Sequence, residues 1–429
     1  MAAHSIHAHL PEPYRFDLVD TDGTASDRCR DHMRAVCLGF HVADPDDRAV
    51  ANYCRDSAGR RLREVRTTTP DLELGGLPVA TLTSYDLSVN TGHGHLEPAD
   101  FITDVTVRAT HRRRGLLRAL MTHDLSQARE SGTALATLTA TEGAIYGRFG
   151  FGVATRTMSV EVTGGRHFSL IHDPAGSIEL ADPGAIDALR VDVFTDFHAR
   201  HRGSHGRLDW HTNMAAGRYQ EFGSTPNRRL RSALHRDPAG RADGVVSYEV
   251  TEDFGSQLTV HDMVAANPDA ELALWDFLTS VDLVTTVRAS HVDPATPLPW
   301  AARDPRMVRI TGMSDLTWLR ILDVCRALEI RGWDHAGSVA FHLTDPLGWC
   351  QGTWRIDVAA PGAQPVVTEL DDATDAPTMD VGTLGSLYFG LAGVRSLAAA
   401  GRVLGTPDEI TALHRFFATV DTAHNISYF

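Results

Sequence analysis

The stretch VTVRATHRRRGLL (105–117) decides the fold of this 429-residue chain. Alternating valines begin it, three consecutive arginines and a glycine follow, and an apolar run then opens. This order predicts a strand that passes through a turn into a helix. The first turn of a helix carries N–H groups without intrahelical partners and the positive end of the helix dipole. We therefore expect an anion such as a pyrophosphate to bind at this turn.

The residues of the turn suit phosphate oxygens. Gly115 lacks the side chain that would block a ligand from the backbone. Arg112, Arg113 and Arg114 supply charge-assisted hydrogen bonds. A run of arginines by itself is usually a solvated surface, so the flanking strand and helix carry this interpretation. The chain has 55 Asp and Glu against 40 Lys and Arg, which argues against a nucleic-acid partner.

The segments around this stretch alternate between strand and helix patterns, as in an α/β fold. Apolar residues recur at spacings of three and four over 113–129, which predicts an amphipathic helix. A short helix is expected over 143–148, ending at the glycines of GFG (150–152). Strands are expected at 77–89, 101–109, 133–140 and 155–162.

Segments rich in glycine and proline divide the chain into three units. The second unit repeats the rhythm of the first without its glycine-arginine turn, as a defective copy would. The third ends in a helix predicted by Thr406-Pro407-Asp408-Glu409, which combines an N-cap, a proline and a capping-box glutamate. We expect its buried stripe to be Ile410, Leu413, Phe416, Phe417 and Val420. The expected domains are 1–162, 163–308 and 309–429.

The sequence shows no sign of a membrane anchor or a metal site. Its longest uncharged stretch, 381–394, is shorter than the roughly 18 residues that span a bilayer. The start of the chain lacks the apolar run of a signal peptide. The 5 cysteines are scattered without metal-binding spacing, so we expect reduced thiols in a cytoplasmic protein and assign no metal.

Several motifs resemble a known family. Arg112-x-x-Gly115-x-Leu117 resembles the coenzyme A loop of the GCN5-related N-acetyltransferases (GNAT), although Leu117 stands where that loop has a small residue. IYGRFGF (145–151) is similar to the segment after the fifth strand of those enzymes. A closer resemblance, to the Eis (enhanced intracellular survival) acetyltransferases, rests on THRRRGLLRA (110–119), EGAIYGRFGFG (142–152), TWLRI (317–321), ALEIRGW (327–333) and LGSLYFG (384–390).

This resemblance implies a fold, an assembly and a co-substrate. The fold would be two tandem GNAT domains, the second degenerate, followed by an α/β domain similar to sterol carrier protein. The chain would form a homohexamer and bind acetyl-CoA. The residues implied to contact acetyl-CoA are Val105, Thr106, Val107, Arg112, Arg113, Arg114, Gly115, Leu116, Leu117, Arg118, Thr141 and Glu142.

The resemblance also implies two catalytic groups. Tyr146 would be the general acid, because a phenol is close enough in pKa to a thiol to protonate the leaving sulfur. The α-carboxylate of Phe429 would be the general base, which requires the last residues, DTAHNISYF (421–429), to reach the first domain. For both residues a plain alternative exists: a tyrosine that only packs and a tail that frays.

We therefore expect an N-acetyltransferase acting on cationic amines, either aminoglycoside-like polyamines or peptide lysines. Asp104 would bind the cationic amine, unless it is a solvent-facing strand residue. The alternative is a non-catalytic carrier of lipid or acyl-CoA, with Leu387, Phe389, Leu391 and Val394 lining a pocket in the third unit. The same apolar stripe is also what an ordinary buried helix needs.

Overall fold

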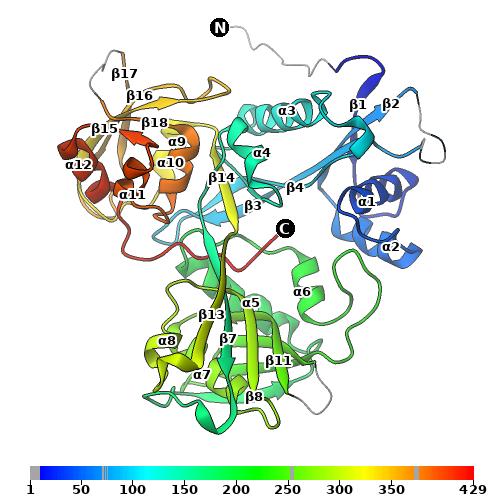
Figure 1. Cartoon of the computed structure of the whole chain (residues 1–429), viewed down its shortest axis with the longest axis vertical. Helices are drawn as coiled ribbons and strands as arrows, with labels where there is room; N and C mark the ends of the chain where they lie inside the picture. The colour runs from blue at the N-terminus through cyan, green and yellow to red at the C-terminus, as the bar shows by residue number, and fades with distance from the viewer. Residues whose placement is uncertain (1–9, 70–71, 73, 75, 252–255, 372–375) are drawn as a thin grey trace.

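Three β-sheets with helices packed on them form the mixed α/β structure of the chain (Figure 1). The first two sheets have seven strands each and the third has five. The computed structural model describes residues 10–69, 72, 74, 76–251, 256–371 and 376–429.

The N-terminal sheet contains the strand that leads into the arginine turn. Helix α3 packs on one face of this sheet, and α1 and α2 lie on the other (Figure 1). Its strands, in spatial order, are β1 (Tyr14–Asp20), β2 (Arg61–Thr67), β3 (Ala80–Asn90), β4 (Leu96–Val107), β5 (Leu135–Thr139), β14 (Thr317–Ile321) and β6 (Gly152–Val153). The helices are α1 (Asp27–Gly39), α2 (Asp47–Asp56), α3 (Leu116–Glu130) and α4 (Gly143–Tyr146), with short 3₁₀ turns η1 (Ala109–His111) and η2 (Gly147–Phe149).

The central sheet repeats this plan. Helix α7 packs on it around the buried Trp275 and Leu274. Its strands, in spatial order, are β13 (Val308–Asp315), β7 (Arg156–Thr163), β12 (Thr286–Val292), β11 (Gln257–Ala265), β10 (Ala242–Val250), β9 (Arg231–Arg236) and β8 (Ser177–Ala181). The helices are α5 (Asp187–Arg200), α6 (Asp209–Ala215), α7 (Pro268–Ser280) and α8 (Leu298–Ala301), with η3 (Gly165–His167) and η4 (Pro305–Met307).

The C-terminal sheet is smaller and shares its core with the N-terminal one. Leu387, Phe389 and Val394 are buried in that core, so these residues, which the alternative carrier function would place in a lipid pocket, serve packing. The strands, in spatial order, are β17 (Val366–Leu370), β16 (Gly352–Val358), β15 (Gly337–Thr344), β18 (Thr378–Asp380) and β19 (Val403–Leu404). The helices are α9 (Val324–Ile330), α10 (Val381–Tyr388), α11 (Val394–Ala399) and α12 (Pro407–Phe417).

The last helix begins as predicted and ends earlier. Thr406 caps α12, Pro407 follows it, and Glu409 completes the capping box. The expected stripe was wrong at its last member, because α12 stops at Phe417 and Val420 is 81% exposed beyond it. The apolar spacing continued past the helix end, and spacing alone does not show where a helix stops.

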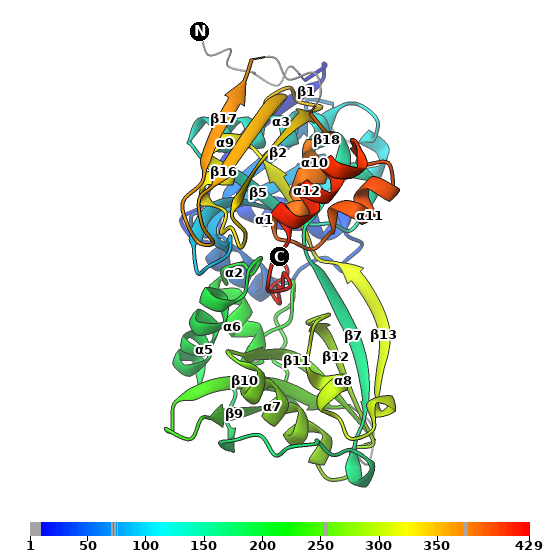
Figure 2. The same cartoon turned by 90° about the vertical axis from the view of Figure 1, so that its left-hand side faces the viewer.

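Three strands cross the expected domain boundaries. Strand β13 lies in the expected third unit from its second residue onward but pairs with β7 in the central sheet. Strand β7, expected in the first unit, pairs with β12 and β13 of the central sheet. Strand β14, expected in the third unit, pairs with β5 and β6 of the N-terminal sheet. Figure 2 shows β7 and β13 running side by side along the central half of the molecule, with their upper ends next to the other half. The two acetyltransferase-like units are therefore joined by exchanged strands.

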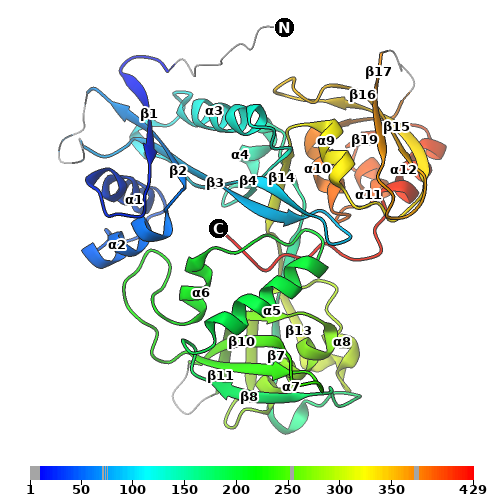
Figure 3. The same ribbon diagram turned by 180° about the vertical axis from the view of Figure 1, so that it is seen from behind.

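The last residues of the chain lie between the N-terminal and central sheets (Figure 3). After α12 the chain runs as an extended segment without regular secondary structure. We call residues 421–429 the tail. Its buried members include Ala423, His424, Asn425 and Ser427. The tail is therefore held by packing and hydrogen bonds rather than frayed.

Candidate active site

Strands β4 and β5 separate partway along their length. They pair in parallel from Asp100 to Ile102 of β4, opposite Ala136 to Leu138 of β5. Strand β4 then continues to Val107. Over this part, β3 is the one described strand that pairs with it. The backbone of residues 103–107 therefore presents an edge that an extended ligand with amide groups can pair with, as an added strand would.

A bulge in β4 points Asp104 into this opening. Between Thr103 and Thr106 the strand carries one residue more than its partner β3, and Asp104 takes the left-handed conformation, with φ of 54°. A bulge shifts the alternation of side chains by one residue. Asp104 therefore lies on the face of the sheet that also carries Phe101, and is buried rather than facing solvent.

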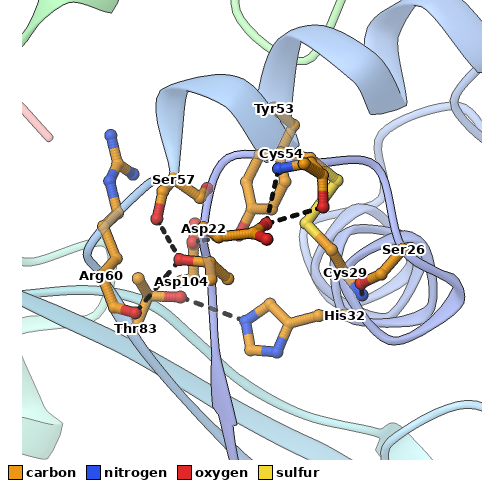
Figure 4. The surroundings of a disulfide bond; sticks show 12 residues. Asp22, Ser26, Cys29, His32, Tyr53, Cys54, Ser57, Arg60, Thr83 and Asp104 are labelled. Atoms are coloured by element: carbon orange, nitrogen blue, oxygen red, sulfur yellow. Dashed lines mark hydrogen bonds between the residues drawn. A yellow bond between two sulfur atoms is a disulfide. The ribbon is translucent and has the colours of Figure 1, made fainter.

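The hydroxyl of Tyr53, on α2, donates a 2.7 Å hydrogen bond to the Asp104 carboxylate (Figure 4). Burial, and the Asp104 charge after it, raise the pKa of Tyr53 well above its usual value. The phenol therefore stays protonated at neutral pH and remains a hydrogen-bond donor to Asp104. That arrangement suits a cationic ligand.

The arginine turn lies at the N-terminus of α3, which begins at Leu116. Gly115 occupies the N-cap position with φ of 79°, a conformation that glycine adopts at little cost, and Arg113 is also left-handed, with φ of 64°. A Cβ on Gly115 would meet no described atom within 4 Å, so the space beside the turn is open. Arg112, Arg113 and Arg118 are exposed there. Geometry and charge both fit a diphosphate.

Arg114 is only partly available to a ligand. Its guanidinium donates to the Tyr14 hydroxyl and to the carbonyl of Thr110. Thr106 is engaged too, because its hydroxyl shares a 2.7 Å hydrogen bond with that of Thr81 inside the domain. The hydroxyl of Thr106 is therefore already engaged and not free for a ligand. Val107, Leu116 and Leu117 pack toward the α3 core.

Tyr146 ends α4 and is 5% exposed. Burial, with a smaller contribution from the Glu142 charge, raises the pKa of Tyr146 to about 12. Its ring packs edge-on to Phe151 at 6.1 Å between centroids. Tyr146 therefore packs in the core, as a purely structural tyrosine would. It also lines a cavity at the opening between β4 and β5.

Phe429 reaches the first domain. Its ring lies 4.9 Å from that of Phe101 and 5.5 Å from that of His205. The hydroxyl of Thr139, the last residue of β5, donates a hydrogen bond to the backbone oxygen of Phe429. The end of the tail thus lies where β4 and β5 part.

One cavity brings several predicted residues together. We call it the notch cavity. Of the predicted site residues, Asp104, Val105, Thr141, Tyr146 and Phe429 line it. Arg112, Arg113, Arg114, Gly115 and Arg118 lie at the α3 terminus and not in its lining. Its full lining is Phe40, Val42, Ile102, Thr103, Asp104, Val105, Thr139, Thr141, Tyr146, Glu221, Phe222, Tyr428 and Phe429.

A second cavity adjoins the first and shares Thr103, Asp104, Glu221, Phe222 and Phe429 with it. We call it the adjoining cavity. Among its lining are three acidic side chains and a single arginine, namely Asp56, Asp104, Glu221 and Arg60. Burial, and the Asp104 charge after it, raise the pKa of Glu221. Because acidic side chains outnumber the basic one, the adjoining cavity is suited to a positively charged ligand, whose charge would also favour the ionised form of Glu221.

Sequence reasoning missed the residues that the central domain and α2 contribute. Trp210, Tyr219, Glu221 and Phe222 come from α6 and the segment after it, and Tyr53 comes from α2. None of them lies in a motif, and the folding of two domains against each other brings them to the cavity. The acidity of the whole chain was the one available signal, and it does not identify positions.

The expectation of fully reduced cysteines was wrong for one pair. Cys29 of α1 and Cys54 of α2 form a disulfide, with their Cα atoms 6.1 Å apart (Figure 4). Cys37, Cys325 and Cys350 are free. The scattered spacing could not show that α1 and α2 lie side by side. The disulfide joins the two helices next to Tyr53, which contacts Asp104.

Neither a membrane span nor a metal cluster is found in the part of the chain that the structure describes. No helix among these residues has the length and apolar character needed to cross a membrane. In the same residues, no group of three or more His, Cys, Asp or Glu is arranged to hold a metal ion.

Comparison with family models agrees with the three sheets. Residues 27–154 match an acetyltransferase (GNAT) domain, and residues 203–321 match a second GNAT domain model. Residues 324–424 match a sterol carrier protein domain. The predicted fold of two GNAT domains followed by a sterol-carrier-like domain is thus confirmed.

Related proteins cover most of the chain. An uncharacterized N-acetyltransferase of Streptomyces avermitilis is 35% identical over 407 residues, covering 91% of this chain and 93% of the relative. The N-acetyltransferase Eis of Mycobacterium tuberculosis is 32% identical over 315 residues, covering 71% of this chain and 74% of the relative. The crystal structure of Eis1 from Mycobacterium abscessus shares the fold, with a TM-score of 0.76 over 97% of this chain and 100% of that chain, at 24% identity. The chain therefore belongs to the Eis-like family of GNAT N-acetyltransferases.

Proposed function

We propose that the chain transfers an acetyl group from acetyl-CoA to an amine of a cationic substrate, an aminoglycoside-like polyamine or a peptide lysine. The observation that carries the proposal is the notch cavity, which places Asp104, Tyr146 and Phe429 around one opening between β4 and β5. The acidic lining of the adjoining cavity supports a cationic amine as the acceptor.

Acetyl-CoA supplies the activated acetyl group when it is bound. The exposed arginines and the N-terminus of α3 would bind its diphosphate, and the free edge of β4 would pair with its pantetheine amides. The open space beside Gly115 supports this fit. Holding amine and thioester together in one cleft lowers the entropic cost of their meeting, so direct transfer needs no acyl-enzyme.

Two groups of the chain then handle protons. The Phe429 carboxylate accepts the proton that the amine must lose, directly or through a water molecule. Tyr146 keeps its proton at neutral pH and donates it to the departing sulfur. Asp104 holds the cationic substrate in place through its charge. The reaction written in this way requires no metal ion.

The test is thiol release from acetyl-CoA in the presence of a panel of amines. We expect Tyr146→Phe, and a chain extended by residues after Phe429, each to lower kcat by about 100-fold or more. Tyr248→Phe is the matched control, because Tyr248 is an equally buried tyrosine of the central domain and should keep its kcat. A wild-type chain that releases no thiol with any amine but binds a fatty acid would replace this proposal with the carrier function.

The assembly and the location are also proposals. A homohexamer is supported by the family and by the exposed apolar residues Ile310 and Met313 on the edge strand β13. Light scattering should then give six times the 46.7 kDa mass of one chain. We place the reaction in the cytoplasm, where acetyl-CoA is made, and fractionation of the source cells tests this placement.

A further inference from the structure

The central domain has an opening like that of the first domain. Strands β11 and β12 pair in parallel from Gln257 to Thr259, opposite Thr286 to Arg288, and then part. In the first domain the corresponding opening faces the notch cavity. In the central domain, the tail lies against the diverging strands.

Three contacts attach the tail to this opening. The ring of Tyr428 stacks on His291 of β12, with 5.4 Å between centroids and 14° between planes. Arg207 donates a hydrogen bond of 3.2 Å to the Ser427 hydroxyl and forms an ion pair with Asp262 of β11. Ile426 joins a buried cluster of the central domain, which includes Val264 of β11.

The tail is also held in its extended path by its own side chains. The Oδ1 atom of Asn425 accepts from the backbone N–H groups of His205, at 3.3 Å, and Ser427, at 3.1 Å. The Nδ2 atom of Asn425 donates to the carbonyl of Ser427 at 2.7 Å. Asn425 and Ser427 are both buried, so these bonds are shielded from water.

His211 of α6 binds the tail one residue before its end. Its Nε2 atom lies 3.0 Å from the carbonyl oxygen of Tyr428, and its Nδ1 atom lies 3.1 Å from the backbone nitrogen of Leu208. Nδ1 also lies 3.2 Å from the carbonyl oxygen of Leu208. The tautomer with the proton on Nε2 satisfies two of the three contacts, because Nε2 then donates to the Tyr428 carbonyl and Nδ1 accepts from the Leu208 N–H. Burial lowers the pKa of His211 to about 3, and the ring stays neutral in this tautomer.

The two domains thus each supply one donor to the end of the tail. His211 of the central domain binds the carbonyl of Tyr428, and Thr139 of the first domain binds the backbone oxygen of Phe429. In the proposed function the Phe429 oxygen is one of the two carboxylate oxygens, so Thr139 binds the carboxylate itself and His211 fixes the carbonyl just before it. Together the two donors leave the carboxylate little freedom. The ring of Trp210, which lines the adjoining cavity, stacks on His211 at 3.8 Å between centroids and restrains its orientation.

We propose that the central domain is a clamp for the tail and that His211 is the positioning residue that sets where the Phe429 carboxylate lies. The degenerate domain uses its strand opening to hold a segment of its own chain. The proposal rests on the proposed function, in which that carboxylate accepts the proton of the amine.

The test compares His211→Leu with His211→Gln in the full chain, because the amide nitrogen of glutamine can donate to Tyr428 and leucine cannot. The readouts are kcat, KM for acetyl-CoA, and the rate at which carboxypeptidase Y releases Phe429. For His211→Leu we expect kcat to fall about tenfold, the scale of one buried hydrogen bond, with KM for acetyl-CoA unchanged and Phe429 released faster. His211→Gln should recover most of both losses.

His342→Leu is the matched control. His342 of β15 also makes a side-chain hydrogen bond, to Thr353, but lies in the C-terminal domain, so its loss should change neither kcat nor the release of Phe429. If His211→Leu does not fold, Ser427→Ala carries the test, since it removes only the hydrogen bond from Arg207.

The outcomes separate the two proposals. Wild-type release of Phe429 from His211→Leu would overturn the clamp, whatever the kcat. Equal losses in the leucine and glutamine variants would overturn the role of the hydrogen bond. Faster release with unchanged kcat would support the clamp and count against the Phe429 carboxylate as the base.

Discussion

Asp104 owes its place in the cavity to one backbone torsion. In a regular strand it would alternate with Thr103 and point toward α3. The left-handed φ of 54° adds one residue on the β4 side and turns the carboxylate toward Tyr53 and the adjoining cavity. A charge in this partly buried position interacts with a ligand more strongly than one at the surface.

Asp104→Asn keeps the shape of the side chain and removes its charge. We expect KM for polyamine substrates to rise about tenfold or more, since hydrogen bonds to charged groups contribute about 1.5–3 kcal/mol, while KM for acetyl-CoA stays the same. Steady-state kinetics with each substrate varied in turn measures both. Asp86→Asn, at an exposed position on β3, is the control. An unchanged KM for every amine would show that Asp104 does not bind the substrate.

The role of Tyr146 as general acid predicts how kcat depends on pH. A general acid works in its protonated form, and burial raises the pKa of Tyr146 to about 12. Raising the pKa extends the protonated form to higher pH, so ionisation of Tyr146 should not reduce kcat below about pH 10. A pH profile of thiol release between about pH 7 and pH 10 measures this. A descending limb centred near pH 9 would contradict the assignment.

At the scale of elements, the turn before α3 combines a backbone requirement with a binding role. Gly115 at φ of 79° caps the helix and leaves open space beside it. Gly115→Ala costs about 1–2 kcal/mol for the left-handed conformation and places a methyl group where the diphosphate is expected. We predict that KM for acetyl-CoA rises about tenfold and KM for the amine is unchanged.

Gly401→Ala is a matched control for this variant. Gly401 has φ of 74°, and a Cβ added there would meet no described atom within 4 Å, but this residue lies in the C-terminal domain. Both variants should lower the Tm by similar amounts, and only Gly115→Ala should change KM. Equal KM values in the two variants would remove Gly115 from the cofactor site.

The pairing of α1 with α2 through Cys29 and Cys54 gives a second prediction for elements. A disulfide across a separation of 25 residues stabilises a fold by roughly 3 kcal/mol through the unfolded state. We expect Cys29→Ser to lower the Tm by more under non-reducing conditions than in the presence of a reductant, where only the buried hydroxyl destabilises the fold. Alkylation of the unfolded protein, followed by mass measurement, should find three reactive thiols. Five reactive thiols would show that the pair is reduced.

At the scale of the whole molecule, buried histidines gather where the tail meets the two acetyltransferase-like domains. Burial lowers the pKa of His205, His211 and His424 to about 3 each. In the unfolded chain these rings bind protons near pH 6.5, so below that pH the unfolded state binds more protons than the folded state. Their contribution to stability is therefore complete above about pH 6.5 and is lost as the pH falls toward 3.

We predict that the urea midpoint falls between about pH 7 and pH 5, with each of these histidines contributing up to about 1.4 kcal/mol per pH unit below 6.5. Unfolding followed by tryptophan fluorescence at several pH values measures this slope. His424→Asn should reduce the slope relative to wild type, because it removes one of the three groups. An unchanged slope in that variant would mean that His424 is already protonated in the fold or is not buried.

Much of the fold was predictable from local pattern. The alternating valines before the arginine turn, the apolar spacing of α3, and the capping box at Thr406 each fix their element through neighbouring residues in the chain. The exchange of β7 and β14 was not predictable. A strand pattern indicates that a segment pairs with some strand, but it does not indicate which sheet that strand belongs to. The domain boundaries drawn from composition stay a prediction for the same reason.

For the site, the sequence by itself determined the chemistry of the anion-binding turn and, through its motifs, the family. Those features are local: a helix terminus, a glycine and a run of arginines act within a few residues of one another. Only the tertiary structure decided the acidic cavity and the course of the tail. Tyr53, Asp104, Glu221 and Phe429 are far apart in sequence, and long-range packing of domains, which leaves no local pattern, brings them together.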